Sequence, residues 1–161
     1  MIKDKINAIK LVATDVDGTL TDGGMYYAES GDEFKKFNAK DGMAMKMLMK
    51  VGKKVAIISH GHSKEMVHRR ARVLGVDMCY VGDKPKVDVL RAWIEPLGLE
   101  MHEIAYVGDD VNDIELMKLV GLSVCPSDAV RAVREEADIV LSRGGGEAAF
   151  RELVDDYLLR Y

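Results

Sequence analysis

Residues 9–24, IKLVATDVDGTLTDGG, decide the fold of this 161-residue chain. The mainly apolar segment 9–13 predicts a strand that is buried on both faces and that leads directly to Asp15 and Asp17. Alternation along an extended backbone points both carboxylates the same way, while Val16 turns toward the core. Such close carboxylates repel each other unless a divalent cation or a shared proton lies between them. An ordinary acidic turn is the alternative, but ligands of parallel sheets bind at strand tips, so we expect a functional site here.

Length, charge and cysteine content narrow the class of protein. At 161 residues we expect one domain, residues 1–161. The net charge of −4 comes from interspersed acidic and basic residues, so no basic stripe indicates a nucleic-acid partner. The first ten residues are charged and contain no apolar run typical of a signal peptide or a membrane span. Cys79 and Cys125 lie in apolar, strand-like surroundings and are predicted to be reduced thiols of a cytoplasmic protein.

Strand and helix patterns alternate along the rest of the chain. Strands are predicted at residues 55–58, 78–81, 104–107, 122–124 and 139–141, and helices at 63–75, 85–95, 112–120, from 127 or 128, and 147–159. Asp41 is predicted to cap one more helix, which Gly52 ends, and residues 24–38 predict a β-hairpin flap over the acidic tip. This order predicts an α/β fold, a three-layer α/β/α Rossmann-like sandwich on a mostly parallel sheet. The intervals leave no room for a cap domain.

Polar residues follow four of the predicted strands. They are Asp15, Asp17, Ser59, Lys84, Lys86, Asp109, Asp110 and Asp113. Because the carboxyl ends of parallel strands meet at one edge of the sheet, we expect these side chains to form one site. The set contains a nucleophile, an acid/base, a hydroxyl donor, a cation and metal ligands.

Four motifs carry a family resemblance. DVDGTLTDGG, the Ser after KKVAII, the Lys of VGDKPK and GDDVND resemble the four motifs of the haloacid dehalogenase superfamily of phosphohydrolases, over essentially the whole chain. KKFNAKDGMAMKML, IAYVGDDVND and the late GGEAAFRE are similar to its small capless group, which acts on 3-deoxy-manno-octulosonate 8-phosphate or nonulosonate 9-phosphates. The resemblance implies a phosphatase of a 2-keto-3-deoxy sugar acid phosphate, a function of surface-glycan (lipopolysaccharide) synthesis.

The resemblance also implies a reaction. Asp15 attacks phosphorus and becomes an aspartyl phosphate, while Asp17 protonates the leaving alcohol and later deprotonates water. Ser59 and a lysine neutralise the transferring phosphoryl group. The family spacing after the Tyr-Val-Gly turn at residues 80–82 assigns this lysine to Lys86, and Lys84 is the alternative.

A Mg²⁺ ion is the implied cofactor. Its ligands in the resemblance are an oxygen of Asp15, the backbone carbonyl of Asp17 and Asp109. Asp110 and Asp113 are expected to orient waters or backbone and not to bind the metal directly.

The predicted substrate contacts lie in the run Ser59-His60-Gly61-His62-Ser63, which is one residue longer than the family pattern. The resemblance implies contacts from Gly61 and His62, with simple loop solvation and a His-x-His metal pair as alternatives. It also implies a homotetramer in which Arg151 of a neighbouring subunit reaches the site, although Ala148 stands where the family usually has Gly.

Other functions remain open from the sequence. The same chemistry could serve a different or broader range of sugar and metabolite phosphates. From another class, a phospho-acceptor signalling domain also combines paired acids, a hydroxyl and a lysine, but it places its phosphorylated Asp on a later strand. A non-catalytic assembly module would have little reason to keep every acid.

Overall fold

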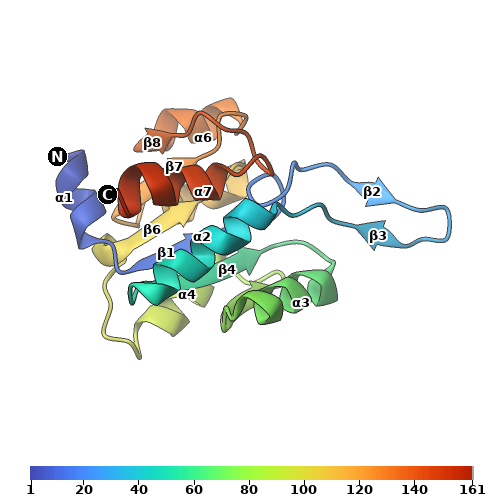
Figure 1. Cartoon of the computed structure of the whole chain (residues 1–161), viewed down its shortest axis with the longest axis horizontal. Helices are drawn as coiled ribbons and strands as arrows, with labels where there is room; N and C mark the ends of the chain where they lie inside the picture. Colours follow the sequence, from blue (N-terminus) through green and yellow to red (C-terminus); the bar gives the residue numbers. More distant parts are fainter. Residues whose placement is uncertain (161) are drawn as a thin grey trace.

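A computed structural model describes residues 1–160, and its centre is a six-stranded parallel sheet (Figure 1). The strand order is β5-β4-β1-β6-β7-β8. The strands are β1 Leu11–Thr14, β4 Lys54–Ser59, β5 Met78–Val81, β6 Ile104–Val107, β7 Leu122–Cys125 and β8 Ile139–Val140. Because β1 pairs with β4 on one side and with β6 on the other, the strand order reverses at β1. The tip of β1 is therefore the switch point at which ligands of such sheets bind.

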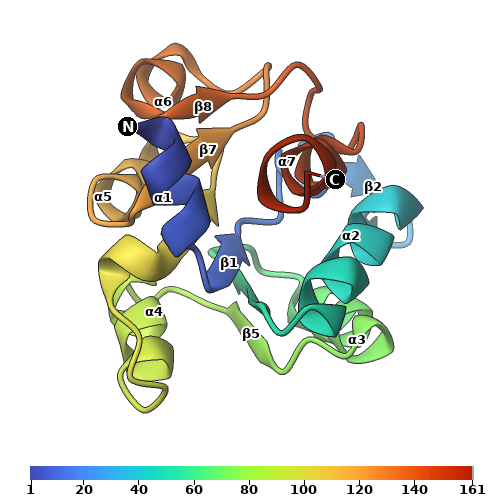
Figure 2. The ribbon, with the colours of Figure 1, turned by 60° about the vertical axis from the view of Figure 1, so that its left-hand side comes forward.

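Helices cover both faces of the sheet, as Figure 2 shows. One face carries α2 (Ala39–Lys50), α3 (Lys64–Leu74) and α7 (Ala149–Leu153). The other carries α4 (Lys86–Ile94), α5 (Ile114–Met117) and α6 (Arg131–Glu136). This arrangement confirms the predicted three-layer α/β/α fold. Within residues 1–160, no helix is both long and apolar enough to cross a bilayer.

The alternation of side chains along β1 feeds both hydrophobic cores. Leu11 and Ala13 belong to the cluster beneath α4, α5 and α6, whereas Val12 belongs to the cluster beneath α2, α3 and α7. All three are fully buried. Burial of a Leu or Val side chain stabilises a fold by about 1.5–3 kcal/mol, so the packing on both faces holds β1 rigidly under its acidic tip.

Some predicted helix ends differ from the structure. Asp41 does not cap α2, because Asn38 is the N-cap and its side chain accepts a hydrogen bond from the Lys40 amide. Asp41 instead lies buried in the first turn, where its Oδ1 accepts from the Arg151 amide at 3.0 Å. Its side chain therefore ties α2 to the start of α7, a contact between distant segments that no local pattern reveals.

Several other elements are shorter than predicted or were not predicted. The segment 112–120 forms a 3₁₀ turn, Val111–Asp113, followed by the short α5. Helix α6 starts later than predicted, and the last helix runs as α7 and then as a π-helical segment, Val154–Leu158. The charged N-terminus contains α1, Ile2–Ala8, which no prediction covered, and a 3₁₀ turn, Met101–Glu103, precedes β6.

The hairpin lies where the sequence predicts it. Its strands, β2 (Tyr26–Tyr27) and β3 (Glu33–Phe34), are antiparallel and extend away from the sheet beyond the tip of β1 (Figure 1). Its large apolar side chains are exposed, with Met25 and Phe34 each 57% accessible. Two-residue strands without a covered face are not stable by themselves, so contacts at the base of the flap must fix its position.

Substitution of Phe150 tests how much the packing of α7 contributes to stability. Its side chain is fully buried in the cluster that α2, α7 and the sheet share. We expect Phe150→Ala to lower the free energy of unfolding by about 3–5 kcal/mol, because it removes apolar contacts and leaves a cavity. Urea denaturation measures this change, and Val73→Ala on the exposed face of α3 serves as the control. A loss below about 1 kcal/mol would mean that α7 does not close the core.

Candidate active site

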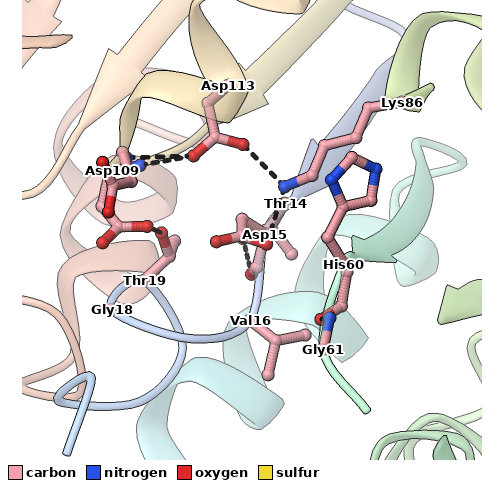
Figure 3. Close-up of polar contacts among 12 residues, drawn as sticks. Thr14, Asp15, Val16, Gly18, Thr19, His60, Gly61, Lys86, Asp109 and Asp113 are labelled. Atoms are coloured by element: carbon pink, nitrogen blue, oxygen red, sulfur yellow. Dashed lines mark hydrogen bonds and ion pairs between the residues drawn. The ribbon is translucent and has the colours of Figure 1, made fainter. Parts of the chain in front are cut away.

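A buried lysine joins two aspartates at the carboxyl edge of the sheet (Figure 3). Asp15 follows β1, Asp113 ends the 3₁₀ turn after β6, and Lys86 is the first residue of α4. Lys86 Nζ lies 2.8 Å from Asp15 Oδ1 and 2.7 Å from Asp113 Oδ1. Tyr106 of β6 donates its hydroxyl proton to Asp113 Oδ1 at 2.6 Å and accepts from Lys86 Nζ at 3.0 Å. Segments that are distant in the sequence thus contribute to one buried network.

Burial and charge act against each other in this network. Burial raises the pKa of Asp15 to about 6, although the Lys86 ammonium pulls it back. Burial alone would lower the pKa of Lys86, but the charges of Asp15 and Asp113 outweigh it and raise that pKa. Burial also raises the pKa of Tyr106 well above its ordinary value, so this hydroxyl remains a hydrogen-bond donor. Lys86 therefore stays charged and favours the ionised form of Asp15.

Asp113 holds the acidic loop after β6. Its Oδ2 accepts from the amides of Asp109 at 2.9 Å and Asp110 at 3.2 Å, while its Oδ1 is taken up by Lys86 and Tyr106. This carboxylate has partners on both oxygens, in keeping with the expected role in orienting the backbone. Asp110 is exposed, and its Oδ1 accepts from the amide of the following residue.

Asp109 is directed toward the tip of β1. Burial and the negative charge of Asp15 raise its pKa to about 8. Thr19 Oγ1 donates to Asp109 Oδ1 at 3.3 Å. A Cβ atom on Gly18, whose φ is +85°, would lie 2.0 Å from Asp109 Oδ2, so the turn after Asp17 requires glycine. The loop from β1 and the loop from β6 are therefore packed directly together.

These acids have the composition of a magnesium site. Carboxylate oxygens of Asp15, Asp109 and Asp113 lie within 4.8 Å of one another, the one such cluster among residues 1–160. Hard oxygen ligands and uncompensated negative charge are what Mg²⁺ requires. Because both oxygens of Asp113 already have partners, Asp15 and Asp109 are the side chains best placed to hold the ion. The Asp17 carbonyl stays a predicted third ligand.

Asp17 is more exposed than the buried carboxylates of the cluster, with 35% of its side chain accessible. Its Oδ1 pairs with Lys35 Nζ of the flap at 2.6 Å. A Cβ atom on Gly61 would lie 3.0 Å from Asp17 Oδ2 and 3.1 Å from Ser59 Oγ, which places these groups around one point. The Gly61 amide donates to Ser59 Oγ at 3.0 Å. The predicted acid/base and hydroxyl donor are thus side by side.

The geometry places Lys86 in the cluster in preference to Lys84. Lys84 is exposed, and its peptide is held by Tyr80, whose hydroxyl accepts from the Lys84 amide at 3.0 Å. His60 Nε2 lies 2.8 Å from the Lys84 carbonyl oxygen. His60 therefore braces the loop that precedes Lys86, and its ring is not paired with His62, which is exposed.

The side chain of Arg151 has its partner within its own helix. Its Nε pairs with Asp155 Oδ2 at 2.7 Å in the adjoining helical segment. Its predicted role in the site of a neighbouring subunit stays a prediction.

Three contributors to the site were not predicted. Tyr106 has the sequence pattern of a core residue, although a buried tyrosine usually has a partner for its hydroxyl, which could have revealed it. The sequence places Lys35 in the flap and Thr19 in the turn without indicating a contact for either. The contacts of Tyr106, Lys35 and Thr19 span 7, 18 and 90 positions respectively and depend on the folded backbone.

Fold and site together define the class of protein. A carboxylate at the switch point of a doubly wound sheet, paired with a buried lysine and beside metal-competent acids, is equipped to transfer an anionic group. The model of the haloacid dehalogenase-like hydrolases matches residues 38–121. The chain belongs to this family of enzymes, which confirms the predicted resemblance.

Individual relatives agree over nearly the whole chain. The 3-deoxy-D-manno-octulosonate 8-phosphate phosphatase of Haemophilus influenzae is 36% identical over 154 residues, which cover 96% of this chain and 85% of the relative. The Escherichia coli K12 enzyme of the same name is 37% identical, with coverage of 96% and 82%. The crystal structure of the Moraxella catarrhalis phosphatase, in complex with magnesium ion, phosphate ion and KDO, superimposes with a TM-score of 0.90 at 35% identity, covering 95% of this chain and 87% of that one.

The raised pKa of Asp109 predicts how stability depends on pH. In the unfolded chain Asp109 loses its proton near its ordinary pKa of 3.8, but in the fold only near 8. The free energy of unfolding of the metal-free protein therefore falls as pH rises between about 4 and 8. We expect Asp109→Asn to raise it by roughly 1–3 kcal/mol at pH 8, allowing for solvent screening, and by much less at pH 5.

Urea titrations in EDTA at several pH values measure this difference. Asp110→Asn is the matched control, because Asp110 lies next in the chain but is exposed. Equal pH dependence in the wild type and Asp109→Asn would contradict the raised pKa.

Proposed function

We propose that this chain is a Mg²⁺-dependent phosphomonoester hydrolase whose substrate is a phosphorylated 2-keto-3-deoxy sugar acid, of the type of 3-deoxy-D-manno-octulosonate 8-phosphate. The observation that carries the proposal is the pairing of Asp15 with buried Lys86 at the switch point of the sheet. It supplies a nucleophile and a cation at the place where a phosphate would bind.

The proposed reaction has two displacements. In the first, an Asp15 oxygen forms a bond to phosphorus while the bond to the sugar oxygen breaks, and Asp17 gives that oxygen a proton. In the second, Asp17 takes a proton from water as the water oxygen bonds to phosphorus and the bond to Asp15 breaks. Lys86 and the Ser59 hydroxyl offset the charge of the phosphoryl oxygens in both steps. Mg²⁺, held by Asp15 and Asp109, would supply the remaining positive charge.

The substrate class rests on the relatives and on charge near the site. The curated relatives named above are phosphatases of one sugar acid phosphate, and one solved neighbour holds KDO. A hollow of about 250 Å³ at the base of the flap is lined by Lys35, Arg69, Arg70 and three apolar side chains, Phe37, Met66 and Val73. Because the Lys35 ammonium is already paired with Asp17, the two arginines are the groups of this hollow that suit a substrate carrying a carboxylate as well as a phosphate.

A second candidate keeps the chemistry but widens the substrate range. The loop after Ser59 is longer than the family pattern, and His62 is exposed. The resemblance implies a Gly followed by Arg or Glu at this loop as the contact to the sugar acid, and with His62 in that place the sugar acid would be held less specifically. This candidate predicts similar turnover of several sugar phosphates.

One experiment separates the two candidates. Phosphate release is measured with Mg²⁺ on 3-deoxy-manno-octulosonate 8-phosphate, a nonulosonate 9-phosphate and hexose phosphates. We expect one sugar acid phosphate to exceed the hexose phosphates by at least about a hundredfold in kcat/KM, and Asp15→Asn to reduce turnover by at least about a thousandfold. Weak, uniform turnover would favour the second candidate. Turnover unaffected by Asp15→Asn would contradict the mechanism.

We also propose a cytoplasmic homotetramer in which the flaps of several subunits pack together. The exposed apolar side chains Met25, Tyr26, Tyr27 and Phe34 support an interface on the flap. Arg151 would then contribute to a neighbouring site. Sedimentation equilibrium is expected to give four times the subunit mass, and Tyr27→Glu with Phe34→Glu to give a smaller species. A monomeric wild type at working concentration would exclude this assembly.

A further inference from the structure

Lys35 is a buried charge on an otherwise exposed hairpin. It directly follows β3, and its side chain is only 5% exposed, whereas that of the next residue, Lys36, is 68% exposed. Its Nζ lies 2.6 Å from Asp17 Oδ1 and 3.7 Å from Glu33 Oε1. The side chain of Lys35 therefore lies against the acidic site, whereas that of Lys36 remains in solvent.

The burial of Lys35 requires an explanation, because lysine loses both hydration and rotamer freedom when it is buried. The ion pair with Asp17 offsets this cost, and within that carboxylate Lys35 contacts Oδ1. With Oδ1 held by Lys35, Oδ2 is the Asp17 oxygen that faces Ser59 and Gly61, because a Cβ atom on Gly61 would lie only 3.0 Å from it. The orientation of the Asp17 carboxyl group thus depends on a residue of the flap.

We infer that Lys35 is a positioning residue for the proton-transfer step: it fixes Asp17 so that Oδ2 is directed at the leaving oxygen, and it couples this orientation to the placement of the flap. The inference rests on the proposed function and names a role for a flap residue within it. Lys35 is neither the donor nor the acceptor of the transferred proton. The proton moves from Asp17 Oδ2 to the sugar oxygen as the phosphorus–oxygen bond breaks.

The role predicts a dependence on the leaving group. A sugar alkoxide is a poor leaving group and needs the proton of Asp17, whereas 2,4-dinitrophenolate leaves without one. The ratio kcat/KM reports events up to release of this first product. We expect Lys35→Met to lower kcat/KM for the best sugar phosphate by about tenfold to a hundredfold, and for 2,4-dinitrophenyl phosphate by less than about threefold. Lys35→Arg restores most of the loss, and Lys36→Met is the matched control with unchanged rates.

Each other result overturns the inference. Equal losses on the two substrates would mean that Lys35 binds the phosphate itself or supports the site as a whole. Unchanged kcat/KM on the sugar phosphate would mean that the ion pair only tethers the flap.

Amide hydrogen exchange over residues 24–38 tests the contact without turnover. Lys35→Met and Asp17→Asn are each expected to speed exchange in the flap, the double variant to add nothing further, and Lys36→Met to leave it unchanged. If the wild type hydrolyses no phosphate ester, the proposed function fails while exchange still reports on the ion pair. Exchange unaffected by both single variants would show that Lys35 and Asp17 do not hold the flap.

Discussion

Repulsion among carboxylates at one edge of the sheet is the constraint on which the rest of the site depends. Asp15, Asp17, Asp109 and Asp113 converge there, and two unit charges 4 Å apart repel by about 4 kcal/mol at an effective dielectric constant of about 20. Two buried lysines offset part of this repulsion, Lys86 between Asp15 and Asp113 and Lys35 beside Asp17. Asp109 has no lysine partner in the network, and its pKa is raised furthest among the acids of the cluster, to about 8. The carboxyl group without a lysine partner thus lies where a divalent cation would bind and favour its ionised form, which makes metal binding a consequence of how the lysines are distributed.

The sheet explains why this concentration of charge could be predicted from the sequence. Short apolar runs that end in polar residues identify strands and their tips. Parallel pairing brings these tips to one edge of the sheet regardless of the lengths of the helices between the strands. The positions of Asp15, Ser59 and Asp109 follow from this rule, which leaves Lys84 and Lys86 as alternatives that, in the sequence, only the family spacing separates. The choice of Lys86 over Lys84 follows from the first turn of α4: Lys86 is its first residue, whereas Lys84 lies before Pro85 and remains in solvent.

The parts that the sequence did not predict depend on contacts between distant segments. Tyr106 has the pattern of a core residue, and only the approach of Lys86 and Asp113 turns its hydroxyl into part of the site. Asp41 has the residue type of a helix cap, but Asn38, three residues earlier, is the N-cap of α2. Asp41 instead accepts a hydrogen bond from the amide of Arg151. Burial raises its pKa to about 6, and that amide and the nearby arginines only partly counter the increase. In both cases local propensity is outweighed by a partner outside the local segment, which a pattern of neighbours does not contain.

The flap contributes one of the two lysines that offset the carboxylate charge, and its own position depends on that contact. The two short strands bury almost nothing of their own, and Met25, Tyr27 and Phe34 remain exposed, so the hairpin has little stability apart from its base. At the base, the charge pair between Lys35 and Asp17 connects the flap to the strand tip. One ion pair therefore has two effects: it offsets the charge of Asp17, and it anchors the hairpin to the strand tip. A surface that covered the exposed apolar side chains of the hairpin would stabilise the same anchor, because the two antiparallel strands are paired with each other. Closure of a capless site and orientation of its acid/base would then be a single event, governed by where one lysine is held.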